Sequence, residues 1–137
     1  MACEGGVSQA VSVFLLGKDG ENMRRLGSAK RVSERDKQLM AELKDVVARH
    51  VPGASLILYG SAARGKRAPD SDYDVVILTG RRLSSAEERL LDRAIYDLQV
   101  ERGVVLSAAV YSEEEWRRPL LRASPYWKNV AREGILV

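Results

Sequence analysis

Two short apolar runs, Ser55–Tyr59 and Val75–Leu78, lie near the middle of the chain between turn-forming residues. Both are rich in residues that favour strands, so each predicts a buried strand. A third run, Val104–Tyr111, is apolar along almost its whole length. Continuous apolar character of this kind is typical of a strand that is buried on both faces.

Apolar residues at helical spacing predict two long helices between these strands. The first begins at Ser33, within a capping-box pattern, and Pro52-Gly53 ends it. The second opens at Ser85-Ala86-Glu87-Glu88, which fits another capping box, and Gly103 ends it. The apolar stripes are Leu39, Met40, Leu43, Val46 and Val47 in the first helix, and Leu90, Leu91, Ala94, Ile95 and Leu98 in the second.

The C-terminal part predicts shorter helices over residues 112–116 and 124–132. Tyr126, Trp127 and Val130 are expected to pack the last helix against the core, with nucleobase stacking as the alternative for the two aromatic residues. The order of elements predicts a small α/β core in which about three strands are covered by helices.

Residues 1–32 give the weakest pattern, and three interpretations stay open. Val11–Leu16 is apolar enough for an edge strand, followed by turn-forming residues. The same stretch also fits a loosely docked, partly disordered tail, or sequence upstream of a true start at Met23. The chain therefore divides into an N-terminal extension, 1–32, and a domain, 33–137.

Candidate chemistry concentrates between the first two strands. Gly60-Ser61 and the small residues after it are expected to begin a helix, where free backbone N–H groups bind phosphate. Asp72 and Asp74 are two apart at the start of the next strand, so their side chains leave the same face. Two close carboxylates repel each other unless a cation lies between them, and Mg²⁺ also bridges nucleotide phosphates. This segment therefore predicts a metal–nucleotide site.

The fuller pattern, Gly-Ser-x-Ala-Arg-Gly before Ser-Asp-x-Asp, resembles the signature of the minimal nucleotidyltransferases in the DNA polymerase β-like nucleotidyltransferase superfamily. The matching residues are Gly60, Ser61, Ala63, Arg64, Gly65, Ser71, Asp72 and Asp74. The resemblance implies a nucleotidyltransferase fold with a small mixed sheet, and transfer of a nucleoside monophosphate, with ATP the favoured donor, to an acceptor hydroxyl. It implies Mg²⁺ on the catalytic residues Asp72 and Asp74, and nucleotide contacts from Gly60, Ser61, Arg64, Lys66 and Ser71.

One expected feature of an active enzyme is missing. Catalytic members that this chain resembles generally add a third carboxylate on the strand after the second long helix, and the run 104–111 has no acid. Ser107 is expected at that position, and Glu101 and Glu113 each lie roughly 20 Å away along an extended strand. Two functions therefore stay open: an active nucleotidyltransferase, and a catalytically degenerate nucleotide-binding module that acts through a partner.

The same resemblance suggests a partner, because small members of this family often pair with a HEPN-domain protein in toxin–antitoxin systems. The net charge of +3, without a block of lysine and arginine, gives little support for nucleic-acid binding. The single cysteine, Cys3, suits a reducing cytoplasm, and the early apolar stretch is too short to span a membrane. Self-association stays open.

Simpler interpretations compete at several positions. Gly60–Lys66 also fits the phosphate loop G-x-x-x-x-G-K, but Arg67 stands where that motif requires serine or threonine. Aspartates that open a strand often only cap turn amides, and loop cations are often only solvated. His50, the only histidine, is expected to interact with the end of its helix rather than to act as a base or metal ligand.

Overall fold

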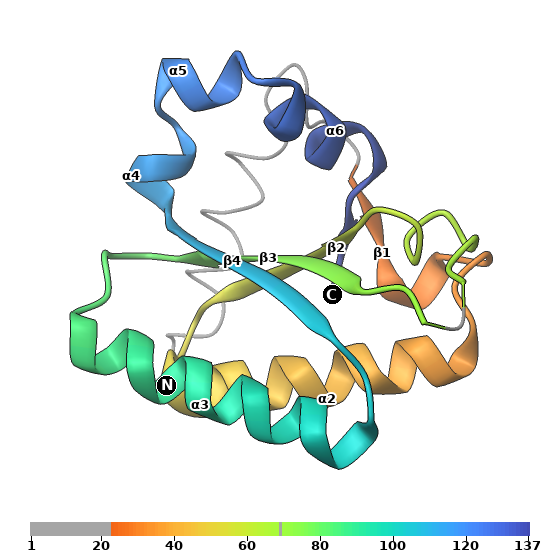
Figure 1. The fold of residues 1–137 in the computed structure, drawn as a ribbon. Helices are drawn as coiled ribbons and strands as arrows, with labels where there is room; N and C mark the ends of the chain where they lie inside the picture. Colours follow the sequence, from red (N-terminus) through yellow and green to blue (C-terminus); the bar gives the residue numbers. More distant parts are fainter. Residues whose placement is uncertain (1–22, 69) are drawn as a thin grey trace.

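The computed structural model describes residues 23–68 and 70–137, in which helices cover both faces of one sheet (Figure 1). The predicted edge strand at Val11–Leu16 lies outside these residues. In chain order the elements are β1 (Arg24–Arg25), the short 3₁₀ helix η1 (Leu26–Ser28), α2 (Glu34–His50), β2 (Ser55–Tyr59), β3 (Tyr73–Thr79), α3 (Ser85–Arg102), β4 (Leu106–Ser112), α4 (Glu113–Trp116), α5 (Pro119–Arg122), α6 (Pro125–Glu133) and β5 (Ile135–Leu136).

The sheet is mixed and has the strand order β1-β5-β2-β3-β4. β2 and β3 are antiparallel neighbours, and β3 and β4 are parallel. The three predicted strands are confirmed. β5 and β1 extend the sheet beyond β2, and each has two residues. Strands this short have no periodic pattern, so the sequence could not indicate them.

β4 differs from its prediction in burial. Leu106 and Ser112 at its two ends are buried, but Ser107 is exposed and the residues between are half-buried. The expectation of burial on both faces is wrong because β4 is the outer strand of the sheet, paired with β3 on one side. Small residues such as Ala108 and Ala109 leave an edge strand partly open to solvent even when every side chain is apolar.

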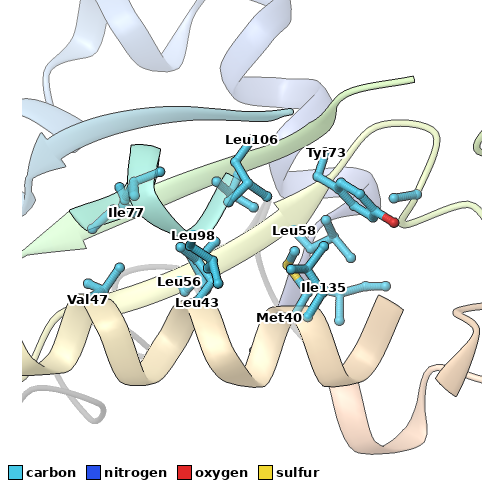
Figure 2. Close-up of a cluster of buried hydrophobic side chains, with 14 of the residues drawn as sticks. Met40, Leu43, Val47, Leu56, Leu58, Tyr73, Ile77, Leu98, Leu106 and Ile135 are labelled. Carbon is cyan, nitrogen blue, oxygen red and sulfur yellow. The ribbon is translucent and has the colours of Figure 1, made fainter. Parts of the chain in front are cut away.

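α2 and α3 cover one face of the sheet; the predicted start of α2 is confirmed, and the capping box of α3 forms one residue before its predicted position. The Ser33 hydroxyl accepts a hydrogen bond from the Asp36 N–H at 3.1 Å, and Ser84 and Glu87 form a reciprocal capping box at α3. Gly103 ends α3 with a positive φ of 66°. Figure 2 shows the resulting core, which includes Met40, Leu43, Val47, Leu56, Leu58, Tyr73, Ile77, Leu98, Leu106 and Ile135.

α4, α5 and α6 form the layer on the opposite face (Figure 1). Trp116, Trp127 and Val130 are at most 1% exposed and pack with the sheet residues Ile57, Val76 and Leu78. The predicted packing of Trp127 and Val130 is therefore confirmed. In the described part of the chain, every helix is too short or too polar to cross a membrane.

Candidate nucleotide-binding site

Asp72 and Asp74 lie at the beginning of β3, on the face that α4–α6 cover. Side chains alternate along a strand, and Val76 and Leu78, which share the parity of Asp74, pack in the core beneath those helices. In the register of the sheet, Asp74 lies between Tyr59 of β2 and Ser107 of β4. The residue after Tyr59 is Gly60, so the end of β2 brings the predicted phosphate-binding turn to the aspartates.

Gly60 is in direct contact with Asp74. Its backbone φ is +79°, a conformation that residues other than glycine rarely adopt. A Cβ at this position would lie 2.5 Å from Asp74 Oδ2. Glycine is therefore required both by the turn and by the close approach of the carboxylate. This contact fixes the backbone of the turn against one of the two predicted metal ligands.

Residues 61–65 form hydrogen-bonded turns and not the expected start of a helix. The Arg64 N–H donates to Gly60 O at 3.2 Å, and the Lys66 N–H donates to Ser61 O at 2.9 Å. Gly65 then adopts a positive φ of 72°, which ends the turn. Among the described residues, no group accepts a hydrogen bond from the N–H groups of residues 61–63. Ala62 and Ala63 are buried and Ser61 is half-buried, so the Ser61 N–H is the donor of this turn that stays within reach of a ligand.

Ser107 lies at the position expected for a third carboxylate. Its hydroxyl donates a hydrogen bond to Asp72 Oδ2 at 3.0 Å, and its backbone is opposite Asp74. Within residues 23–68 and 70–137, no cluster of three or more His, Cys, Asp or Glu side chains is arranged to hold a metal ion. Two aspartates and a neutral hydroxyl are therefore the groups that β3 and β4 present here.

The charge on Asp74 is unfavourable in these surroundings. Its pKa is raised, first by burial and then by the negative charge of Asp72, while Arg64 lowers it and Glu133 raises it. Asp74 is half-buried and Asp72 is exposed, and a cation bound by oxygens of both would stabilise their neighbouring charges. The donor set consists of hard oxygen atoms, so the residues fit a hard divalent cation such as Mg²⁺.

Glu133, the last residue of α6, also lies in the site, and the sequence analysis missed it. Its Oε1 accepts a hydrogen bond from the Gly60 N–H at 3.2 Å and from Arg64 Nη1 at 2.9 Å. One signal was present in the sequence, because a carboxylate in the last turn of a helix is opposed by the helix dipole. The signal marks an unfavourable position for a negative charge, but it does not indicate which segment provides the positive groups that stabilise that charge.

The other predicted nucleotide contacts are placed differently. The Ser71 hydroxyl accepts a hydrogen bond from the Ala68 N–H at 3.1 Å and so helps to close the loop on itself. The Lys66 side chain is exposed and makes no ion pair within the described part of the chain. Arg67 lies on the opposite side of the loop, with its guanidinium 4.2 Å from the centre of the Tyr73 ring. Of the predicted basic contacts, Arg64 is the one that lies beside Asp74.

His50 and the two aromatic residues of α6 have structural roles. His50 is exposed and hydrogen-bonds through Nδ1 to Val46 O of its own helix at 3.1 Å, which agrees with the expected helix-end position. Trp127 is 1% exposed, so its ring has no free face for a nucleobase. Tyr126 is half-buried, and its ring lies at 80° to the ring of Tyr59, with 5.8 Å between ring centres.

The geometry agrees with a comparison against known protein families. The family model of the nucleotidyltransferase domain matches residues 40–131, which include the turn at 60–65, both aspartates and the strands β2, β3 and β4. No curated protein matches the chain. Domains of this family transfer nucleotides from NTP substrates and generally use divalent metal ions. Because the match covers more than half of the sequence, the chain belongs to the nucleotidyltransferase domain family.

Proposed function

We propose that this protein binds ATP together with Mg²⁺ and transfers AMP to a hydroxyl group on a protein acceptor. The observation that supports the proposal most strongly is the contact between Gly60 and Asp74. This contact supports the proposal because the backbone N–H groups of the turn, which would bind phosphate, lie near the carboxylates that would hold the cation. Phosphate donors and metal ligands at one point are what a chelated triphosphate requires.

Each residue of the site has a separate task in this proposal. Asp72 and Asp74 hold the divalent cation, which neutralises phosphate charge when it is bound. Gly60 and Ser61 donate backbone hydrogen bonds to phosphate oxygens, and Arg64 adds a charged donor. Lys66 and Ser71 contribute at the rim of the loop, after a local rearrangement in the case of Ser71, whose hydroxyl otherwise binds Ala68.

The reaction is a substitution at the α-phosphorus of ATP. The acceptor oxygen forms a bond to this phosphorus while the bond to the bridging oxygen of the β-phosphate breaks, and pyrophosphate leaves. The proton of the acceptor hydroxyl passes to solvent. The chain contributes orientation of the triphosphate and stabilisation of the charge that develops on the leaving group.

The resemblance to minimal nucleotidyltransferases suggests that the acceptor is a HEPN-domain protein. The two proteins would then form a toxin–antitoxin pair in the cytoplasm. The test is incubation of such a partner with the protein, Mg²⁺ and ATP labelled at either the α- or the γ-phosphate. We expect label in the partner from α-labelled ATP and none from γ-labelled ATP. Asp72→Asn and Asp74→Asn should abolish the label, and Asp92→Asn, a change at an exposed position on α3, should preserve it.

A second function is favoured by the hydrogen bond between Ser107 and Asp72. A hydroxyl in place of a third carboxylate weakens the hold on a second cation, the one that activates the attacking oxygen. The protein would then be a nucleotide-binding module that acts as an antitoxin-like partner without turnover. Calorimetry separates the two functions: binding of Mg-ATP with no labelling of any acceptor favours the module.

A further inference from the structure

The carboxylate of Glu133 holds two groups that we assign to a nucleotide phosphate. Its Oε1 accepts hydrogen bonds from the Gly60 N–H and from Arg64, across 73 and 69 residues of sequence. Glu133 is 18% exposed and Arg64 47%, so the ion pair is partly shielded from solvent. Carboxylate and phosphate oxygens are both anionic acceptors, and they compete for the same donors.

The main chain of Glu133 is anchored against the sheet. Arg24 donates a hydrogen bond to its carbonyl oxygen at 3.2 Å, and the Gly134 N–H donates to Val130 O at 2.8 Å. A Cβ at position 134 would overlap Val130 O and lie 2.9 Å from Ile57 Cγ2, so the end of α6 packs directly on β2. Displacement of the carboxylate from Gly60 would therefore be a rotation of the Glu133 side chain and not a movement of the helix.

The position is electrostatically costly unless Arg64 and Gly60 compensate it. Glu133 ends a nine-residue helix, where the dipole is negative, and its charge adds to those of Asp72 and Asp74. The turn supplies the compensation through one guanidinium and one backbone N–H. A third anion thus sits beside the paired aspartates, held by the donors of the phosphate-binding turn.

Resting on the proposed function, we propose that Glu133 is an internal substitute for a nucleotide phosphate, which the incoming triphosphate displaces from Gly60 and Arg64. Binding exchanges the Arg64–Glu133 ion pair for an Arg64–phosphate pair, so the net gain from Arg64 is small. Glu133 therefore determines the affinity for the triphosphate. It acts through Arg64 and Gly60 and is a positioning residue with no contact to the reacting atoms.

The test is titration calorimetry of the full chain with two probes, Mg-ATP and Mg-tripolyphosphate. Glu133→Gln removes the competing charge, and we expect it to bind both probes about tenfold more tightly than the wild type. An equal gain for the two probes places the competition at the phosphates. The matched control is Glu114→Gln, which makes the same change in net charge at an exposed position on α4 and should bind as the wild type does.

Two further measurements separate competition from a structural role. In the Arg64→Ala background, Glu133→Gln should give a smaller gain because one of the two contested donors is gone. Without any nucleotide, the amide proton resonance of Gly60 should move upfield in Glu133→Gln, since its hydrogen bond to a charged acceptor is weakened.

The outcomes distinguish this inference from the function on which it rests. If the wild type binds Mg-ATP and Glu133→Gln binds it equally or more weakly, Glu133 is a structural link between α6 and the turn, and the inference is overturned while the function stands. A lower unfolding midpoint of that variant with unchanged affinity leads to the same conclusion. If neither protein binds either probe, both proposals fail.

Discussion

Ser107 of β4 donates its hydroxyl to Asp72 Oδ2 at 3.0 Å, next to the strand that bears both predicted metal ligands. This hydrogen bond joins the outer strand of the sheet to the site. It also shows that a side chain at position 107 reaches the Asp72 carboxylate, so the identity of this residue decides whether β4 adds an acid to the two aspartates. A substitution at position 107 can therefore test whether the lack of an acid on β4 limits catalysis.

Replacement of Ser107 by aspartate should increase nucleotide transfer. The new carboxylate would supply the charged ligand that a second cation requires, and we expect the rate at saturating ATP to rise at least about tenfold. Without a divalent cation, Ser107→Asp should be less stable than the wild type, because like charges would face each other across neighbouring strands. Ser107→Asn is the control. If Ser107→Asp transfers nucleotide no faster than the wild type, the missing third carboxylate does not limit the rate of transfer.

Substitution of Gly60 by alanine should abolish Mg-ATP binding. The new Cβ would lie 2.5 Å from Asp74 Oδ2 and would force either the turn or the carboxylate to move. The positive φ adds strain, and we expect a loss of about 1–3 kcal/mol in the free energy of unfolding. Gly80→Ala is the matched control, since a Cβ there meets no atom within 4 Å. Normal binding by Gly60→Ala, measured by calorimetry, would contradict the assigned contact.

Tyr73 connects the start of β3 to the first turn of α2, because its hydroxyl donates to Asp36 Oδ1 at 2.6 Å. Tyr73→Phe leaves the Asp36 carboxylate without this donor, and we expect it to lower the free energy of unfolding by about 1.5–3 kcal/mol. Tyr96→Phe, at an exposed position on α3, is the control. Urea denaturation at neutral pH measures both changes, and equal stabilities of the two variants would contradict the assignment.

The same tyrosine predicts a change of stability in alkali. Burial, followed by the hydrogen bond to Asp36, raises the pKa of Tyr73 from 10.0 to about 12. A pKa that is higher in the folded protein gives stability that is present below pH 10 and is lost as the pH rises towards 12. The wild type should therefore lose more stability than Tyr73→Phe over this interval. Parallel alkaline unfolding curves for the two proteins would be evidence against it.

Acid should weaken the start of α3 in a defined interval. Arg81, followed by the Ser84 N–H, lowers the pKa of Glu87 from 4.5 to about 2. Because this pKa is lower in the folded protein, the stability from the Glu87 contacts is present above pH 4.5 and is lost as the pH falls towards 2. Arg81→Ala should flatten the dependence of stability on pH in this range. A slope identical to that of the wild type would show that the ion pair does not contribute.

Much of the fold could be predicted from local pattern. The start of α2, most of both apolar stripes and the strands on either side of the loop depend on neighbours within a few positions, so the sequence indicates them directly. Two predicted details of α3 are wrong: its cap is Ser84, one residue before the predicted Ser85, and Leu90, predicted on the apolar stripe, is 62% exposed. The edge position of β4 and the two-residue strands β1 and β5 depend on the order of strands in the sheet. That order is set by packing between distant segments, and a local pattern does not contain it.

The candidate site divides in the same way. Gly60, Asp72 and Asp74 lie within one short segment, and their spacing indicates a turn and a strand that meet at the aspartates. Glu133 reaches this segment from the other end of the domain, through the packing of Gly134 on β2. No spacing rule connects it to Arg64, so its role required the three-dimensional arrangement.

The most direct test of the central claim is a crystal structure of the protein with a non-hydrolysable ATP analogue and Mn²⁺, located by its anomalous signal. We predict the ion between Asp72 and Asp74, bridged to phosphate oxygens that lie against the turn at residues 60–65. A nucleotide bound elsewhere, or aspartates held by arginine or lysine side chains with no ion beside them, would contradict the proposed site.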